Sequence, residues 1–93
     1  MKYGELITKS KIVLVAFVYD KAADNYTDLV RIVPETYGTV IQYSENVELF
    51  DAIRIIQFPT LIIYIDGQMV LKQSGDGARE AVREFLEGYT QES

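Results

Sequence analysis

The feature that most constrains the fold is an uninterrupted apolar run near the start of the chain. Residues Ile12–Val18 read Ile-Val-Leu-Val-Ala-Phe-Val, without a polar side chain. A strand with one face in water alternates apolar and polar residues, whereas this run is apolar throughout and rich in β-branched side chains. The run therefore predicts a strand that is buried on both faces, at the centre of a parallel or mixed sheet.

The segments on either side of this strand predict helices. Before it, Tyr3, Leu6 and Ile7 recur at helical spacing and indicate a short helix that ends near Ser10. After it, a stripe of apolar residues follows the i, i+3, i+4, i+7 spacing of a second helix: Tyr26, Leu29, Val30, Val33 and Tyr37.

The second helix is expected to lead into a second strand. Pro34 kinks or ends the helix, because proline and the residue before it disfavour helical geometry, and Gly38 is expected to close the turn. Residues 39–43 then predict a strand. Strand, helix and strand in this order imply a right-handed parallel crossover.

The second half of the chain predicts a helix, a hairpin and a last helix. A helix capped by Ser44 or Asn46 is expected to run through about Arg54, and residues 61–65 and 69–72 are predicted to be strands. Asp66-Gly67 between these strands is a strong signal for a tight antiparallel turn. The last helix carries an apolar stripe: Ala78, Ala81, Val82, Phe85, Leu86 and Tyr89. The order of elements is that of an α/β fold, and the length fits one domain over residues 1–93.

Charge and composition exclude several functions. The net charge is −5 and the nine basic residues are scattered, which disfavours nucleic acid and anionic membranes as partners. The chain has neither cysteine nor histidine, so it lacks the thiolate, the imidazole base and the common zinc ligands. No metal and no cofactor is expected.

The sequence also predicts a location in the cytoplasm. The first eleven residues include Lys2, Glu5, Lys9 and Lys11 and lack the continuous apolar segment of a secretory signal. No apolar run approaches the roughly 20 residues that a membrane span needs.

Four local patterns, in order, resemble the thioredoxin family over almost the whole chain. Leu-Val-Ala-Phe at 14–17 resembles the strand that leads into the family's active-site loop, and Phe58-Pro59-Thr60 resembles its cis-proline segment. Ile-Asp-Gly-Gln at 65–68 resembles its hairpin, and Gly75 its glycine after the hairpin. The resemblance implies a three-layer sandwich, with helices flanking a four-stranded mixed sheet of order 2-1-3-4 whose hairpin strand is antiparallel. The N-terminal strand of full-length thioredoxins would be absent.

The residues that carry thioredoxin chemistry are replaced. On this alignment the Cys-x-x-Cys motif falls on Ala-Ala-Asp-Asn at 22–25, the preceding tryptophan on Lys21 and the buried aspartate on Ala16. A thiolate pair and its proton-handling carboxylate are therefore missing together. The chain is interpreted as a divergent, redox-inactive member that is not an enzyme.

The candidate site is the peptide-facing surface that remains. A cis peptide before Pro59, which the resemblance implies, would turn the backbone of Phe58 outward beside the former active-site loop, where thioredoxins pair with an extended peptide. The hypothetical peptide-binding residues are Tyr19, Lys21, Ala22, Asn25, Phe58, Pro59 and Gly75. The plainer interpretation is that a cis-proline only connects a helix to a strand.

Other interpretations stay open at this stage. Asp20, Asp24 and Asp28 are spaced by four, but acidic residues near a helix N-terminus need no cation to explain them. The alternative function is an enzyme or regulatory protein that uses carboxylates or Tyr19 in non-thiol chemistry. Residues 39–43 are expected at a sheet edge, where the chain could pair with a protein partner or form a homodimer.

Overall fold

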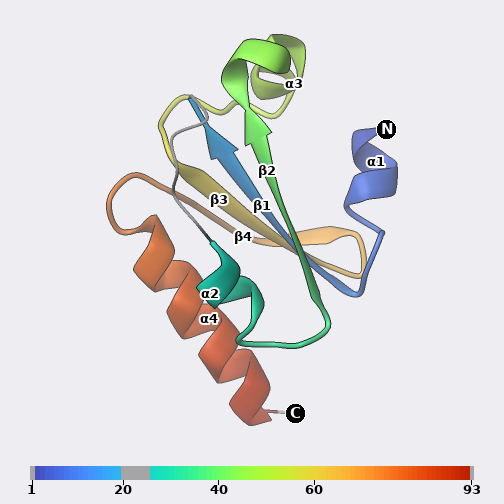
Figure 1. Cartoon of the computed structure of the whole chain (residues 1–93), viewed down its shortest axis with the longest axis vertical. Helices are drawn as coiled ribbons and strands as arrows, with labels where there is room; N and C mark the ends of the chain where they lie inside the picture. The colour runs from blue at the N-terminus through green and yellow to red at the C-terminus, as the bar shows by residue number, and fades with distance from the viewer. Residues whose placement is uncertain (1, 20–25, 93) are drawn as a thin grey trace.

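The computed structural model describes residues 2–19 and 26–92 of the chain. Its elements follow one another as shown in Figure 1: α1 (Tyr3–Leu6), β1 (Ile12–Val18), α2 (Thr27–Val30), β2 (Thr36–Gln42), the 3-10 turn η1 (Tyr43–Glu45), α3 (Val47–Ala52), β3 (Thr60–Ile65), β4 (Gln68–Ser74) and α4 (Ala78–Glu92). Among these residues no helix is long and apolar enough to cross a membrane.

The four strands form one mixed sheet in the order β2-β1-β3-β4. β1 is parallel to β2, as a crossover through α2 requires, and antiparallel to β3. β3 and β4 are antiparallel neighbours. The predicted fold class, strand order and central position of β1 are therefore confirmed.

Each face of the sheet builds its own apolar cluster. Along β1, Ile12, Leu14, Ala16 and Val18 face one side and join residues of α2 and α4. The intervening Val13, Val15 and Phe17 face the other side, together with Phe50 of α3 and Tyr3 of α1. The alternation has the period of two that a strand imposes, although every residue of β1 is buried.

The helices separate onto these two faces. α2 and α4 pack side by side on one of them, and α4 runs along the sheet for fifteen residues (Figure 1). The other face is covered by α1 and α3, which have four and six residues. We call these the aliphatic face and the aromatic face, after the side chains that dominate each cluster.

The hairpin forms where the sequence predicted it. Asp66 and Gly67 both have positive φ, of 53° and 79°, and Ile65 pairs with Gln68 directly across the turn. Two positive φ angles characterise the turns that match the twist of antiparallel strands, and aspartate followed by glycine tolerates them.

The second helix is shorter than its apolar stripe predicted. α2 ends at Val30, β2 already begins at Thr36, and Tyr37 and Gly38 belong to that strand. Tyr37 thus packs on the aromatic face rather than continuing the helix stripe, and Gly38 does not close a turn. A Cβ at Gly38 would overlap Cγ2 of Val30, so this glycine lets α2 lie close to β2.

Candidate functional site

Three strand ends bring three aromatic side chains together at one end of the sheet. Tyr19 follows β1, Tyr43 follows β2, and Phe58 precedes β3 by two residues. Because β2 is parallel and β3 antiparallel to β1, the last residues of β1 and β2 lie beside the first residue of β3. The topology therefore places Tyr19, Tyr43 and Phe58 at the same corner of the molecule.

The rings of this corner are in direct contact. Tyr19 stacks on Tyr43 with centroids 5.7 Å apart and an interplanar angle of 15°. Phe58 meets Tyr19 edge to face at 5.6 Å and Tyr43 at 6.0 Å. Such pairs contribute about 0.5–1.5 kcal/mol each beyond the area that they bury.

Phe50 connects this corner to the core. Its ring, fully buried, lies 5.2 Å from Phe17, 5.2 Å from Tyr43 and 5.8 Å from Phe58. Rings therefore touch one another continuously from the centre of the aromatic face to the surface. We call Tyr19, Tyr43, Phe50 and Phe58 the aromatic corner.

The outer part of the aromatic corner faces solvent. Tyr19 is 64% exposed and Phe58 is 37% exposed, and Ile56, two residues before Phe58 in the sequence, is 87% exposed. Large apolar side chains grouped on a surface mark interaction sites more often than isolated ones do.

Hydrogen bonds hold the residues before and after Phe58. The Phe58–Pro59 peptide is cis, and the carbonyl of Pro59 accepts a hydrogen bond of 2.9 Å from the backbone N–H of Gly75. The hydroxyl of Thr60 donates to the carbonyl of Gln57 at 2.7 Å. Within the described part of the chain, the N–H and C=O of Phe58 itself have no hydrogen-bond partner.

A small hollow lies beside Pro59. It has a volume of about 190 Å³ and is lined by Tyr26, Pro59, Leu61, Gly75, Asp76 and Arg79. Pro59, which borders this hollow, directly follows Phe58 of the aromatic corner. Gly75 has a φ of 81°, a conformation that glycine adopts without strain.

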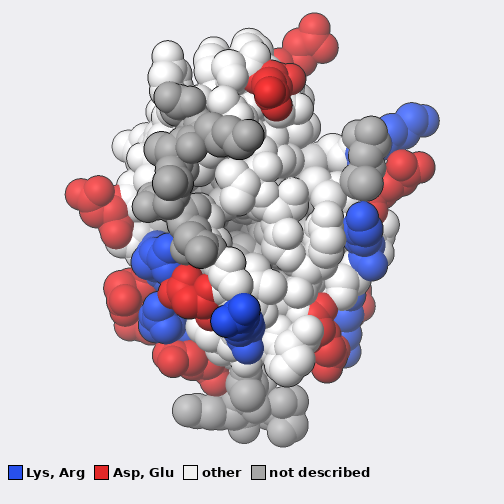
Figure 2. Space-filling model, viewed as in Figure 1, with Lys and Arg blue, Asp and Glu red and all other residues white. Residues whose placement is uncertain are grey.

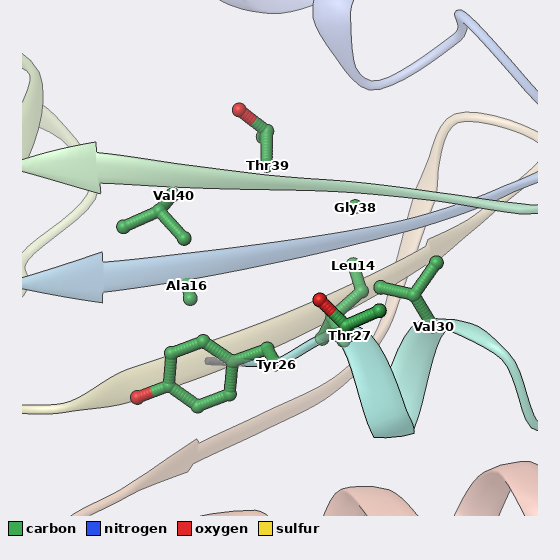
Figure 3. A pocket seen from close by; sticks show the side chains of 8 residues that line it. All are labelled: Leu14, Ala16, Tyr26, Thr27, Val30, Gly38, Thr39 and Val40. Carbon is green, nitrogen blue, oxygen red and sulfur yellow. The ribbon is translucent and has the colours of Figure 1, made fainter. Parts of the chain in front are cut away.

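A larger hollow lies on the aliphatic face, between α2 and β2. Its volume is about 460 Å³, and its lining includes Ala16, where the resemblance places the family's buried aspartate (Figure 3). The side chain of Ala16 is buried among apolar neighbours. An alanine there leaves this position without a group that can transfer a proton.

Near the smaller hollow, Arg79 and Arg83 pair with the carboxylate of Asp28. Arg79 Nη1 donates to both carboxylate oxygens of Asp28, at 2.9 and 2.7 Å, and Arg83 Nη2 donates to Oδ2 at 2.8 Å. Hydrogen bonds from Arg79 hold the pKa of the Asp28 carboxyl below its usual range.

The charge distribution offers no basic surface on the face in view. Acidic and basic side chains are interspersed around its margin in Figure 2. No group of three potential metal ligands occurs in residues 2–19 and 26–92. Asp20 and Asp24, which the sequence grouped with Asp28, lie outside these ranges.

The structure places four of the seven predicted site residues. Tyr19 and Phe58 touch, and Pro59 is joined to Gly75. Lys21, Ala22 and Asn25 lie outside the described residues. Tyr43 and Phe50 were not predicted to belong to the site, although the position of Tyr43 directly after a strand parallel to β1 was a usable signal.

The comparisons with known proteins support the fold. No protein-family model matches the sequence, and no curated protein matches it either. Among solved structures, oxidised thioredoxin from Plasmodium falciparum is 19% identical over 94% of this chain and 88% of its own, with a TM-score of 0.74. Mitochondrial thioredoxin 3 from Saccharomyces cerevisiae is 16% identical over 92% and 86%, with a TM-score of 0.76.

A thioredoxin from Trypanosoma brucei brucei is also similar, at 17% identity over 94% of this chain and 81% of its own, with a TM-score of 0.71. At such identities the likeness establishes the thioredoxin fold and no shared activity. The chain has this fold and contains no cysteine. Its own residues therefore cannot carry out thiol–disulfide exchange.

Proposed function

We propose that this chain is a redox-inactive, non-enzymatic thioredoxin-like domain that binds an extended peptide segment of a protein partner at the aromatic corner. The observation that carries the proposal is the exposed contact between Tyr19 and Phe58, next to backbone groups of Phe58 that have no partner among the described residues. An extended peptide supplies what this surface lacks. Its main chain can pair with Phe58, and an apolar side chain can cover the two rings.

The surroundings of Phe58 favour binding because they are already ordered. Phe50 supports the ring from below, and the hydrogen bond from Gly75 to Pro59 fixes the segment that follows. A surface that needs little reorganisation loses less conformational entropy when a ligand binds. Buried aromatic side chains also dominate the energetics of many protein interfaces.

Selection from a phage-displayed library of random linear peptides tests the binding. Selected peptides are measured by calorimetry against the wild type, Phe58→Ala and Tyr19→Ala. Val70→Ala is the matched control, because Val70 is a comparably exposed apolar residue on β4, away from the corner. We expect Phe58→Ala to weaken binding about tenfold or more, which corresponds to about 1.4 kcal/mol, and Val70→Ala to leave it unchanged.

Two results would overturn the proposal. One is a library selection that yields no peptide binding to the wild type. The other is equal affinity of the selected peptides for the wild type and Phe58→Ala.

The redox-inactive part is tested separately by restoring the thiols. The double variant Ala22→Cys, Asn25→Cys places cysteines where the resemblance puts the Cys-x-x-Cys motif. Because alanine occupies position 16, we expect little reduction of insulin disulfides by this variant. Efficient turnover would show that the surroundings are still suited to thiol chemistry.

A further inference from the structure

One edge of the sheet is unprotected. β2 is an outer strand, and none of the described residues pairs with its free side. Its sequence, Thr-Tyr-Gly-Thr-Val-Ile-Gln, contains no charged residue and no proline, and its pairing with β1 runs without a register shift. Free N–H and C=O groups along such a strand are a template for pairing with another strand.

The opposite edge differs in two of these respects, its charge and its register. β4 carries Lys72, whose ammonium group donates to the carbonyl of Ile53 at 3.2 Å, and its register with β3 shifts between Ile63 and Tyr64. A lysine and a bulge are devices by which natural proteins prevent edge pairing. Their presence on β4 and absence from β2 distinguish the two edges.

We infer that β2 pairs antiparallel with β2 of a second copy of this chain, about a two-fold axis, to form a continuous eight-stranded sheet. Only one two-fold register overlaps the strands over their whole length. It sets Thr39 opposite the partner's Thr39, because Thr39 is the middle residue of Thr36–Gln42. The same register sets Val40 opposite the partner's Gly38 and Tyr37 opposite the partner's Ile41.

The side chains fit this register on the aliphatic face. Val40 is 51% exposed and points to the same side as the 460 Å³ hollow, which Gly38 also lines, whereas Thr39 points the other way (Figure 3). Residues directly opposite on antiparallel strands lie about 4.5–5.5 Å apart. The partner's Val40 would therefore lie beside Gly38, next to Val30, whose Cγ2 already fills the place where a side chain of residue 38 would stand.

The aromatic face is compatible as well. Tyr37 and Ile41 are half-buried against its cluster, and the ammonium group of Lys9 lies 4.8 Å from the centroid of the Tyr37 ring, so only part of each side chain is left for a neighbour. An aromatic residue opposite a β-branched one is among the favourable cross-strand pairs. The two-fold axis repeats this pair on both sides of Thr39.

Charge does not oppose a second copy at this edge. Each copy carries a net charge of −5, which opposes association wherever acidic surfaces meet. β2 contains no Asp, Glu, Lys or Arg, so two copies can meet there without placing like charges of this strand opposite each other. The pairing is independent of the aromatic corner, which lies at one end of the sheet.

Sedimentation velocity over a concentration series tests the association. We expect the wild type to dimerise, and Thr39→Asp to be monomeric because it would set two carboxylates opposite each other at the axis. Val70→Asp adds the same charge to the other edge and is expected to dimerise like the wild type. Mixing Thr39→Asp with Thr39→Lys is expected to restore a dimer, which also guards against a variant that merely folds poorly.

The absence of native cysteines gives a direct test of the register. Thr39→Cys is expected to form a disulfide-linked dimer under mild oxidation, since opposed strand residues fall within the roughly 4.4–6.8 Å between Cα atoms that a disulfide spans. Val70→Cys is expected to stay uncrosslinked.

Three outcomes would overturn the inference. They are a wild type that is monomeric at every concentration, a dimer that Thr39→Asp leaves intact, and failure of Thr39→Cys to crosslink. The first of these outcomes includes a monomer whose β2 strand pairs with a different protein. Phe58→Ala is expected to leave the dimer unchanged, which separates this result from the peptide-binding proposal.

Discussion

The two faces of the sheet are closed in different ways. The aliphatic face is covered by α4, whose fifteen residues set Ala78, Val82 and Leu86 into the cluster without exposing them. The aromatic face has only the short α1 and α3, and its rings continue outward from Phe17 and Phe50 to the exposed Phe58. The long α4 seals the part of the core that it covers, whereas the short α1 and α3 leave part of a core available for contact.

The largest effect should come from removing one buried side chain on each face. Phe50→Ala is expected to lower the free energy of unfolding by about 3–5 kcal/mol, and Leu86→Ala by about 2–5 kcal/mol, because both remove a fully buried side chain and leave a cavity. Urea unfolding followed by circular dichroism measures both values.

The same two variants should differ in their affinity for peptide. Among folded molecules, Phe50→Ala is expected to weaken binding of the selected peptides because Phe58 loses its support, while Leu86→Ala keeps wild-type affinity. Equal loss of affinity in both variants would contradict the division between a sealing face and a contact face.

A smaller effect is expected where α2 approaches β2 on the aliphatic face. Gly38→Ala places a Cβ against Cγ2 of Val30, a β-branched side chain with little freedom to move. We expect a loss of about 1–3 kcal/mol, typical of overpacking. Gly88→Ala in α4 is the control, since its Cβ meets nothing within 4 Å and alanine favours a helix interior. Equal stability of Gly38→Ala and the wild type would contradict the close packing of α2.

On the aromatic face, a pair of tyrosines ties α1 to β3. The hydroxyl groups of Tyr3 and Tyr64 are 2.6 Å apart, and Tyr64→Phe is expected to cost about 1 kcal/mol. Burial raises the pKa of both hydroxyl groups, and for Tyr3 the hydrogen bond adds to this. The folded state thus keeps protons that the unfolded state releases above the ordinary tyrosine pKa of 10.0.

The stability that these tyrosines contribute is therefore complete below pH 10.0 and is lost as the pH rises toward the folded-state pKa values. Urea unfolding at a series of alkaline pH values should show a decline that is shallower in the double variant Tyr3→Phe, Tyr64→Phe. Parallel declines in the two proteins would contradict this assignment.

The helices of the aliphatic face are joined by ion pairs, and we expect these to contribute least to stability. Asp28 accepts hydrogen bonds from Arg79 and Arg83 in an exposed position, where salt screens the interaction. Because the pKa of Asp28 is lowered, its contribution is present above the unfolded pKa and is lost as the pH falls through the folded value. Thermal melts of Asp28→Asn should differ from wild type by less than those of Tyr64→Phe, and a larger shift would contradict this ranking.

The elements that the sequence predicted best are those fixed by local chemistry. The apolar run at β1 predicts a buried segment because it contains no polar side chain. Asp66-Gly67 specifies the turn because both residues tolerate the positive φ angles that the turn requires. The second helix was overestimated because Val33 and Tyr37 continue the helical spacing by coincidence. Tertiary contacts determine where these two side chains pack, since Tyr37 belongs to a strand and lies on the opposite face of the sheet from Val33.

Only part of the aromatic corner was predicted, because the sequence does not show tertiary contacts. Tyr19 and Phe58 followed from the thioredoxin resemblance, but Tyr43 and Phe50 join them only once β1, β2 and β3 are set side by side. A single sequence shows where strands end. It does not show which strand ends become neighbours.

The stacking of Tyr19 on Tyr43 also gives the chain an internal optical reporter. The protein has no tryptophan, so its near-ultraviolet absorption and its emission arise from seven tyrosines and four phenylalanines. The two phenol rings are stacked, with centroids 5.7 Å apart and an interplanar angle of 15°, so the surroundings of each ring include the other. A molecule that settles on the aromatic corner would disturb this pair, so occupancy can be followed without attaching a label.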